Sequence, residues 1–86
     1  MAESRSVRLK RLRMRSWRRG MREMDLLLGP FADAELTGLE DPELAEYEAL
    51  LEENDQELYR WVSGQSVPGA THADLVARIR RYHDIT

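Results

Sequence analysis

Residues 18–31 read Arg18-Arg19-Gly20-Met21-Arg22-Glu23-Met24-Asp25-Leu26-Leu27-Leu28-Gly29-Pro30-Phe31, and within them a strongly basic segment changes into an acidic, leucine-rich one. Arg19 and Glu23 are four residues apart and Arg22 and Asp25 are three apart, so each pair shares one face if the stretch is helical. Gly20 lies beside them, and a glycine there either ends the preceding helix or leaves room for another backbone to lie closely. The stretch therefore predicts a charged junction between a basic segment and an apolar one.

On physical grounds alone, Arg19 and Glu23 form an ordinary surface ion pair worth about 0.3–0.5 kcal/mol, and Gly20 is a helix stop. The order Arg19-Gly20-x-x-Glu23, followed by Asp25 and an apolar run into Pro30-Phe31, also resembles the signature of the SdhE family. These are small succinate dehydrogenase assembly factors that promote covalent flavin attachment. The spacing Glu-x-x-Asp-x-x-Leu-x-x-Trp-x-x-Gly over residues 52–64 is a second block that resembles the same family.

The resemblance implies an all-α protein, a single-domain bundle of about five short helices. It implies an assembly factor that binds the flavoprotein subunit of succinate dehydrogenase, with fumarate reductase as a further candidate partner. The factor would favour the bond between a partner histidine and the 8α carbon of FAD, and we expect it to bind no cofactor itself. The partner-binding residues implied in this way are Arg18, Arg19, Gly20, Arg22, Glu23, Asp25, Pro30 and Phe31.

The length and the charge of the chain limit which folds and partners are possible. Eighty-six residues make one small domain over 1–86, for which we expect short tails at 1–6 and 84–86. The net charge is −3, but residues 1–22 hold nine of the thirteen lysines and arginines, while residues 23–57 hold thirteen of the sixteen acids and no base. A chain with two electrostatic halves is suited to orienting an encounter with a charged partner.

Several function classes are excluded or disfavoured. The absence of cysteine excludes disulfides, thiolate metal sites and a cysteine nucleophile. No nucleophile motif or phosphate-binding glycine loop occurs, so we predict that the protein is not an enzyme. We expect no metal site, because the acids of residues 46–53 are predicted to form a solvated face and His72 and His83 to be surface residues. No apolar run approaches the roughly 20 residues of a membrane span. Lacking a separable leader, the chain is expected in the bacterial cytoplasm, with the mitochondrial matrix as the less favoured compartment.

The N-terminal segment leaves one alternative function open. A helix is predicted from Val7 onward, and its arginines would share one narrow face: Arg8, Arg11, Arg15 and Arg18. Such a row could bind phosphates, so the alternative is a module that binds nucleic acid or another anionic surface. Only Trp17 is aromatic in this segment, and the sequence has no helix-turn-helix, zinc-finger or RNA-binding aromatic pattern. A solvated or partner-facing basic helix is the preferred interpretation.

Residues 21–28 predict a second helix with an apolar side, and Gly29-Pro30 is expected to break or kink the chain. Phe31 is expected either in the core, which we favour, or at a contact surface. Whether the helix resumes after Phe31 is left open.

Three signals mark the later helices. Asp41 is expected to be an N-cap with Pro42 at the first helical position, and the next residues repeat an apolar face. Asn54 and Glu57 have the spacing of a capping box, for a helix that closes at Gly64 and uses Trp61 as a core anchor. After a loop, Thr71 is expected to cap a last helix, with Asp74 as its reciprocal partner.

Overall fold

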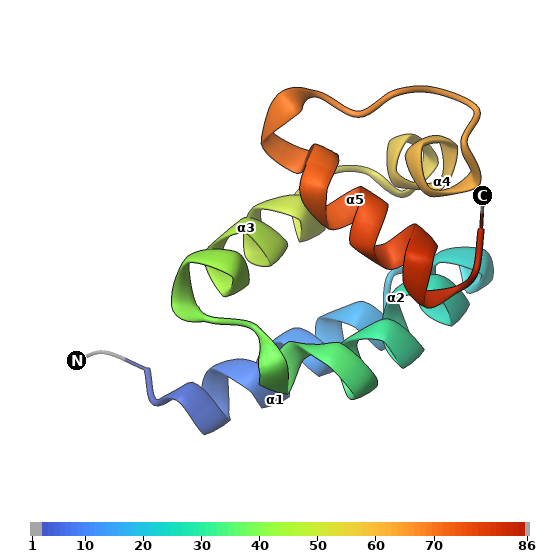
Figure 1. Ribbon diagram of the computed structural model, residues 1–86. Helices are drawn as coiled ribbons and strands as arrows, with labels where there is room; N and C mark the ends of the chain where they lie inside the picture. The colour runs from blue at the N-terminus through green and yellow to red at the C-terminus, as the bar shows by residue number, and fades with distance from the viewer. Residues whose placement is uncertain (1–2, 86) are drawn as a thin grey trace.

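The computed structural model describes residues 3–85 and contains helices but no strand in that range. The predicted all-helical bundle is confirmed. Its elements are α1 (Arg5–Trp17), α2 (Arg22–Glu35), the 3-10 turn η1 (Leu36–Gly38), α3 (Asp41–Leu51), α4 (Asp55–Ser63) and α5 (Ala70–Tyr82). In Figure 1, α1 and α2 lie together on one side of the molecule, and α3, α4 and α5 form the other side. The predicted tails at 84–86 and 1–6 include residues 1, 2 and 86, which lie outside the described range.

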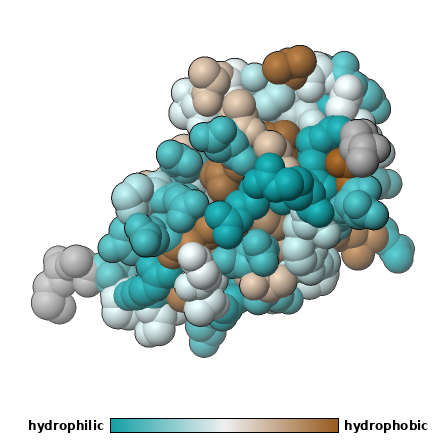
Figure 2. All heavy atoms as spheres, in the orientation of Figure 1, coloured by the Kyte–Doolittle hydropathy of each residue, from teal (hydrophilic) through white to brown (hydrophobic). Residues whose placement is uncertain are grey.

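One apolar core joins all five helices. Every helix contributes fully buried side chains to it, among them Leu12, Met24, Tyr47, Leu58 and Ile79. The buried residues of each helix recur at helical spacing, so each helix is amphipathic. Each is stable only when the other helices cover its apolar side. The face shown in Figure 2 is mostly polar, with small apolar patches between hydrophilic side chains.

α2 continues through Gly29 and Pro30, so the expected break at this dipeptide is wrong. Pro30 cannot donate a hydrogen bond to the carbonyl of Leu26, one turn earlier, and Leu26 lies on the exposed side of the helix, where that carbonyl can be hydrated. The opposite side of the same segment is buried through Leu28 and Phe31. Core packing on both sides of the proline therefore keeps the helix intact to Glu35.

Helix starts differ from the predicted ones by one or two residues. α1 begins at Arg5 rather than Val7, because the Ser4 hydroxyl accepts a hydrogen bond from the Val7 amide (3.3 Å). The N-cap of α3 is Glu40, not Asp41, and the Glu43 carboxylate accepts a hydrogen bond from the Glu40 amide (3.1 Å).

Three later caps were predicted, at Asn54, Gly64 and Thr71, and the first two are correct. The N-cap of α5 is Gly69, with no side-chain hydrogen bond, so the predicted Thr71 cap is wrong. At α4 the Asn54 side chain accepts from the Glu57 amide (2.8 Å), and Gly64 ends the helix in the left-handed conformation, as predicted.

The basic helix and the acidic helix pack against each other. Glu48 of α3 accepts hydrogen bonds from Arg8 and Arg11, both at 3.0 Å, and Arg15 pairs with Glu52 at 3.2 Å. We call these five residues the α1–α3 seam. The acids of residues 46–53 are therefore not simply a solvated face, because two of them neutralise the arginines of α1. Local spacing could not predict these ion pairs, because the partners lie about forty residues apart in the sequence and meet only in the folded chain.

Candidate partner-binding site

The turn between α1 and α2 is built around Gly20. α1 ends at Trp17 and α2 begins at Arg22, and Gly20 between them has φ +90°, a left-handed conformation that side chains disfavour. A Cβ at Gly20 would meet no atom within 4 Å. Gly20 therefore reverses the chain after α1, and the turn also faces open space.

Arg19 fastens this turn to the rest of the bundle. Its Nε donates to Asp55 Oδ1 (2.8 Å), its Nη1 to the Leu51 carbonyl (2.5 Å) and its Nη2 to the Glu53 carbonyl (2.7 Å). The last carbonyls of α3 lack partners within the helix and carry partial negative charge, so a planar guanidinium satisfies them well. The Arg19 side chain is only 11% exposed. We call this set of bonds the Arg19 clamp.

The backbone of the turn is fixed as well. The Arg19 amide donates to Asp25 Oδ1 at 2.6 Å, which holds the first turn of α2 against the residue before Gly20. The expected Arg19/Glu23 ion pair is therefore wrong, since Arg19 bonds instead to Asp25 and to the start of α4. The spacing of four residues had suggested Glu23 as the ion-pair partner of Arg19. In the fold, the buried guanidinium of Arg19 lies beside Asp55 instead.

The other charged side chains of the turn have no charged partner among the described residues. Arg18, Arg22 and Glu23 are exposed, and none of them takes part in an ion pair or a side-chain hydrogen bond within residues 3–85. Desolvating such charges against complementary groups would give strong, oriented hydrogen bonds. We call the residues around this turn the charged edge: Arg18, Arg19, Gly20, Arg22, Glu23 and Asp25.

The last two predicted site residues lie farther along α2. Pro30 is half-buried, whereas Phe31 is fully buried and packs against Tyr47 and Tyr82, with ring centroids 5.9 and 5.8 Å apart. The favoured interpretation of Phe31 as a core residue is confirmed. In this conformation its ring offers no contact surface, and the roles of all the predicted site residues in partner binding stay predictions.

Asp55 is the functional candidate that the sequence reasoning missed. It belongs to the second family-like block, residues 52–64, to which no site role was given. In the structure this block meets the first one through the Arg19–Asp55 ion pair. The signal that could have found it is the opposite charge of the arginines in residues 18–22 and the acids in residues 52–57.

The histidines are not the surface residues that were predicted. The ring of His72 stacks on Trp61 with centroids 5.6 Å apart, its side chain is 13% exposed, and its Nε2 is 3.5 Å from Glu53 Oε1. His83 Nε2 lies 2.6 Å from the Leu27 carbonyl, so the end of α5 crosses α2 there. Trp61 is partly buried against the core, consistent with an anchor between helices.

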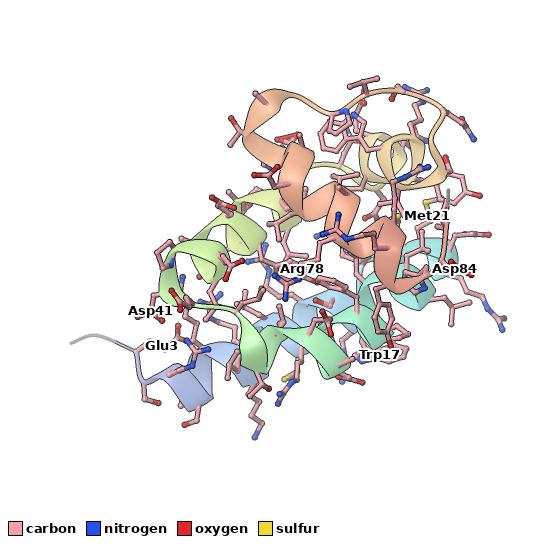
Figure 3. All side chains as sticks on the ribbon, viewed as in Figure 1. Glu3, Trp17, Met21, Asp41, Arg78 and Asp84 are labelled. Atoms are coloured by element: carbon pink, nitrogen blue, oxygen red, sulfur yellow. The ribbon has the colours of Figure 1, made fainter. Side chains whose placement is uncertain are left out.

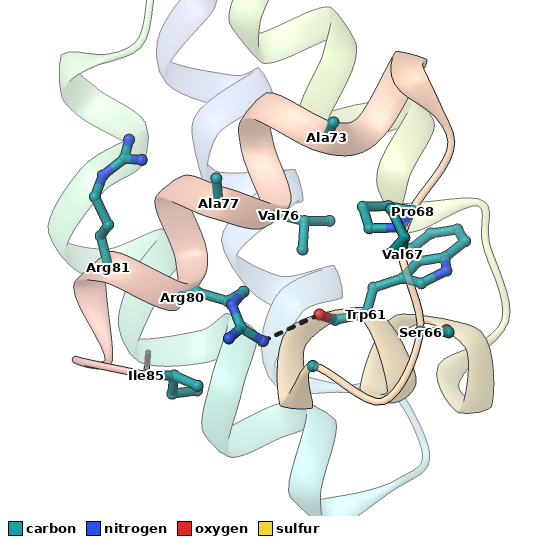
Figure 4. A pocket seen from close by; sticks show the side chains of 11 residues that line it. Trp61, Ser66, Val67, Pro68, Ala73, Val76, Ala77, Arg80, Arg81 and Ile85 are labelled. Carbon is teal, nitrogen blue, oxygen red and sulfur yellow. Dashed lines mark hydrogen bonds between the residues drawn. The ribbon is translucent and has the colours of Figure 1, made fainter.

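The described part of the chain gives little support for a metal site, a membrane span or a nucleic-acid-binding surface. Residues 3–85 contain no group of three or more acids or histidines placed to hold a metal ion, and none of their helices is long and apolar enough to cross a membrane. A hollow of about 450 Å3 lies between α4 and α5, and Arg80 on its wall donates hydrogen bonds to the Val62 carbonyl (2.8 Å) and to that of Trp61 (Figure 4). Because Arg8, Arg11 and Arg15 are paired internally, the alternative of a nucleic-acid or anionic-surface module is not favoured.

Comparison with known proteins agrees with the sequence resemblance. A family model described as "Flavinator of succinate dehydrogenase" matches residues 10–83. The curated "Succinate dehydrogenase assembly factor 2, mitochondrial" of Meyerozyma guilliermondii is 43% identical over 61 residues, covering 71% of this chain and 45% of that protein. "FAD assembly factor SdhE" of Legionella pneumophila (strain Paris) is 40% identical over 63 residues, covering 73% of this chain and 80% of that protein. The chain thus spans about half or less of the fungal relatives it matches. No solved structure matches it.

Proposed function

Because the chain belongs to the family described as flavinator of succinate dehydrogenase, we propose that it is an assembly factor that binds the flavoprotein subunit of succinate dehydrogenase and promotes covalent attachment of FAD. Curated relatives named as a succinate dehydrogenase assembly factor and as a FAD assembly factor support this proposal. The observation that carries it in the structure is the charged edge, where Arg18, Arg22 and Glu23 are exposed around the open Gly20 turn and have no ion-pair partner among residues 3–85.

The factor acts by differential binding and contributes no catalytic group of its own. If the charged edge binds one conformation of the flavoprotein more tightly, namely the one in which the attachment site and the flavin are aligned, that conformation becomes more populated. Each 1.4 kcal/mol of preference changes the population about tenfold, so a few kcal/mol are sufficient. The isolated protein should therefore show no turnover.

The residues of the edge have different roles in this proposal. Glu23 and Arg22 make charge-assisted contacts to the partner, and Gly20 lets the partner backbone approach closely. Arg19 acts as a positioning residue, because its donors are already bonded to the ends of α3 and α4 and hold the turn in place. Asp25 supports it through the Arg19 amide.

Three finer points belong to the same proposal. Fumarate reductase is proposed as a second partner. FAD is attached to the partner and is not held by this chain. The protein acts in the bacterial cytoplasm, a placement that the similarity to a bacterial relative supports. The mitochondrial relatives leave the matrix as the competing compartment.

The proposal is tested by co-expressing the protein with the flavoprotein subunit and measuring covalent flavin by in-gel fluorescence. Glu23→Ala should strongly reduce flavin attachment without loss of helical circular dichroism. Glu46→Ala is the matched control, because Glu46 is also an exposed helical carboxylate without an ion pair in the described range. Normal flavin loading without the protein, or equal loading with both variants, would contradict the proposal.

Gly20 needs a different control. Any side chain at φ +90° strains the backbone, at a cost of about 1–2 kcal/mol. Gly20→Ala and Gly20→Arg share that cost, but only arginine adds bulk and charge at the edge. A larger loss of flavin attachment for Gly20→Arg than for Gly20→Ala would indicate that the partner approaches this turn; equal losses would reduce Gly20 to a structural role.

A further inference from the structure

An exposed tryptophan at the end of α1 is held in a fixed position. Trp17 is 40% exposed, yet its ring lies directly on Gly29 of α2, where a Cβ would overlap the indole. Its Nε1 donates to Asp33 Oδ2 at 3.1 Å, which also fixes the orientation of the ring. Figure 3 shows Trp17 at the end of α1 opposite Glu3. A large aromatic surface is therefore presented to solvent in one orientation.

The exposed side of α2 continues this aromatic surface. Leu26 is 52% exposed, and it lies one turn before Gly29 and Pro30 on the same side of the helix. Glu23 precedes Leu26 by three residues and so begins the same line of side chains. We call Trp17, Leu26 and Pro30 the apolar strip. By this helical spacing, the strip adjoins the charged edge at Glu23 and reaches Trp17 at Gly29.

From these contacts we propose that the apolar strip is the second half of the partner interface, and that it binds an apolar segment of the same flavoprotein subunit whose charged groups meet the edge. This inference rests on the proposed function and extends it to Trp17 and Leu26, which the family signature does not include. The strip is assigned to this partner because it is continuous with the edge through Glu23, so one protein surface can cover both.

The physical argument is one of preorganisation. An exposed indole usually samples several rotamers, and ordering it on binding reduces affinity. Here the contact with Gly29 and the hydrogen bond to Asp33 already hold the indole of Trp17 in one orientation. Buried aromatic anchors surrounded by polar residues are typical of the centre of a binding interface. Trp17 and Leu26 fit that description, with Glu23 and Asp33 as polar neighbours.

The test measures the dissociation constant between the full chain and the purified apo flavoprotein subunit of succinate dehydrogenase. Leu26→Ser removes an exposed side chain, so its melting curve should match that of the unmodified chain. Its dissociation constant should rise about tenfold. The matched control is Val67→Ser in the loop after α4, since Val67 is 89% exposed and lies outside the strip. This control should bind like the unmodified chain.

Trp17 is tested by two variants, because its removal could also loosen the packing of α1 on α2. Trp17→Phe keeps a ring over Gly29 but loses the bond to Asp33, and Asp33→Asn keeps an acceptor for the indole. We expect weaker binding for Trp17→Phe and unchanged binding for Asp33→Asn, with both variants folded.

Each outcome decides something. If the unmodified chain does not bind the flavoprotein, the proposed function fails and this inference fails with it. If the unmodified chain binds and Leu26→Ser binds equally well, the apolar strip is not part of the interface, and the proposed function stands. If the unmodified chain sediments as a dimer that Leu26→Ser dissociates, the strip joins two copies of this chain and the inference is overturned.

Discussion

Two arginine-rich regions of this molecule, the α1–α3 seam and the charged edge, use the same residue type in opposite ways. At the seam, Arg8, Arg11 and Arg15 are neutralised by carboxylates of α3. At the edge, only a few residues later, Arg18 and Arg22 have no such partner in the described range. A basic sequence therefore does not by itself indicate a basic surface, and the arginines left unpaired are the better candidates for binding.

The largest expected effect separates Arg19 from its neighbour Arg18. Arg19→Ala removes the clamp and leaves Asp55 and two carbonyls without their donor, so we expect the free energy of unfolding to fall by about 2–4 kcal/mol. Arg18→Ala should change it by less than about 0.5 kcal/mol, since Arg18 is exposed and has no partner within the part of the chain that the structure describes. Urea denaturation followed by circular dichroism measures both.

Asp55→Ala is the matching change from the other side of the clamp. It should destabilise the fold nearly as much as Arg19→Ala, and the double variant should lose less than the sum of the two. Equal stability of the Arg19 and Arg18 variants would show that the clamp contributes nothing and that Arg19 belongs with the unpaired residues of the edge.

This clamp also shows what the sequence could and could not predict. Local patterns were sufficient for Leu44, Tyr47 and the cap at Asn54, because helical periodicity and capping depend on residues within one or two turns. The partner of Arg19 lies thirty-six residues away, and no local rule ranks Asp55 above Glu23. Packing between distant parts of the chain therefore determines that Arg19 pairs with Asp55.

The same limit explains the other differences. α2 passes through Pro30 because the core holds both of its ends, and the tertiary contacts that override this local signal are not visible in a single sequence. His72 was predicted at the surface because it has no sequence neighbour with which to pair. In the fold, the face of Trp61 covers it. For the candidate site, the sequence motif indicates which residues to consider, but not which of its arginines is buried.

The second largest effect lies at the buried centre between α1 and α3. Ser16 and Tyr47 are both fully buried, and their hydroxyl oxygens are 2.6 Å apart. Ser16→Ala leaves the Tyr47 hydroxyl without this partner, so the free energy of unfolding should fall by about 1–3 kcal/mol. Adding Tyr47→Phe should recover part of that loss, because no buried hydroxyl then remains. A double variant as unstable as the sum of the single ones would contradict this account.

Because Tyr47 is buried beside Ser16, we also expect the fold to lose stability at alkaline pH. Burial raises the pKa of Tyr47 to about 12, although the hydrogen bond shared with Ser16 and the nearby charges of Arg19 and Arg15 lower it. The raised pKa means that the folded state favours the neutral phenol. Its contribution to stability is complete below the ordinary value of 10 and is lost as the pH rises from 10 toward 12. In Tyr47→Phe, this part of the alkaline decline in melting temperature should disappear.

Glu48 gives a smaller effect at the opposite end of the pH range. Partial burial raises the pKa of its carboxyl, but hydrogen bonds from Arg11 and Arg8 outweigh burial and hold it below the ordinary value of 4.5. The stabilisation is therefore present above pH 4.5 and is lost as the pH falls through the lowered pKa. Glu48→Gln should cost about 1 kcal/mol at pH 7 and less at pH 3. Glu46→Gln, which breaks no ion pair, should show no such pH dependence.

The smallest effect on stability is expected at the edge, where the effect on association should be largest. In the double variant Arg18→Ala/Arg22→Ala, the free energy of unfolding should change by less than about 0.5 kcal/mol, because neither side chain has a partner in the described range. Unpaired surface charges steer encounters, so association with the flavoprotein should slow and depend less on salt concentration. Stopped-flow mixing at several ionic strengths measures this, with Arg8→Ala as the control from the seam. If Arg8→Ala slows association as much as the double variant does, the internal pairing of the seam leaves its arginines as available to a partner as those of the edge, and the distinction between the two regions disappears.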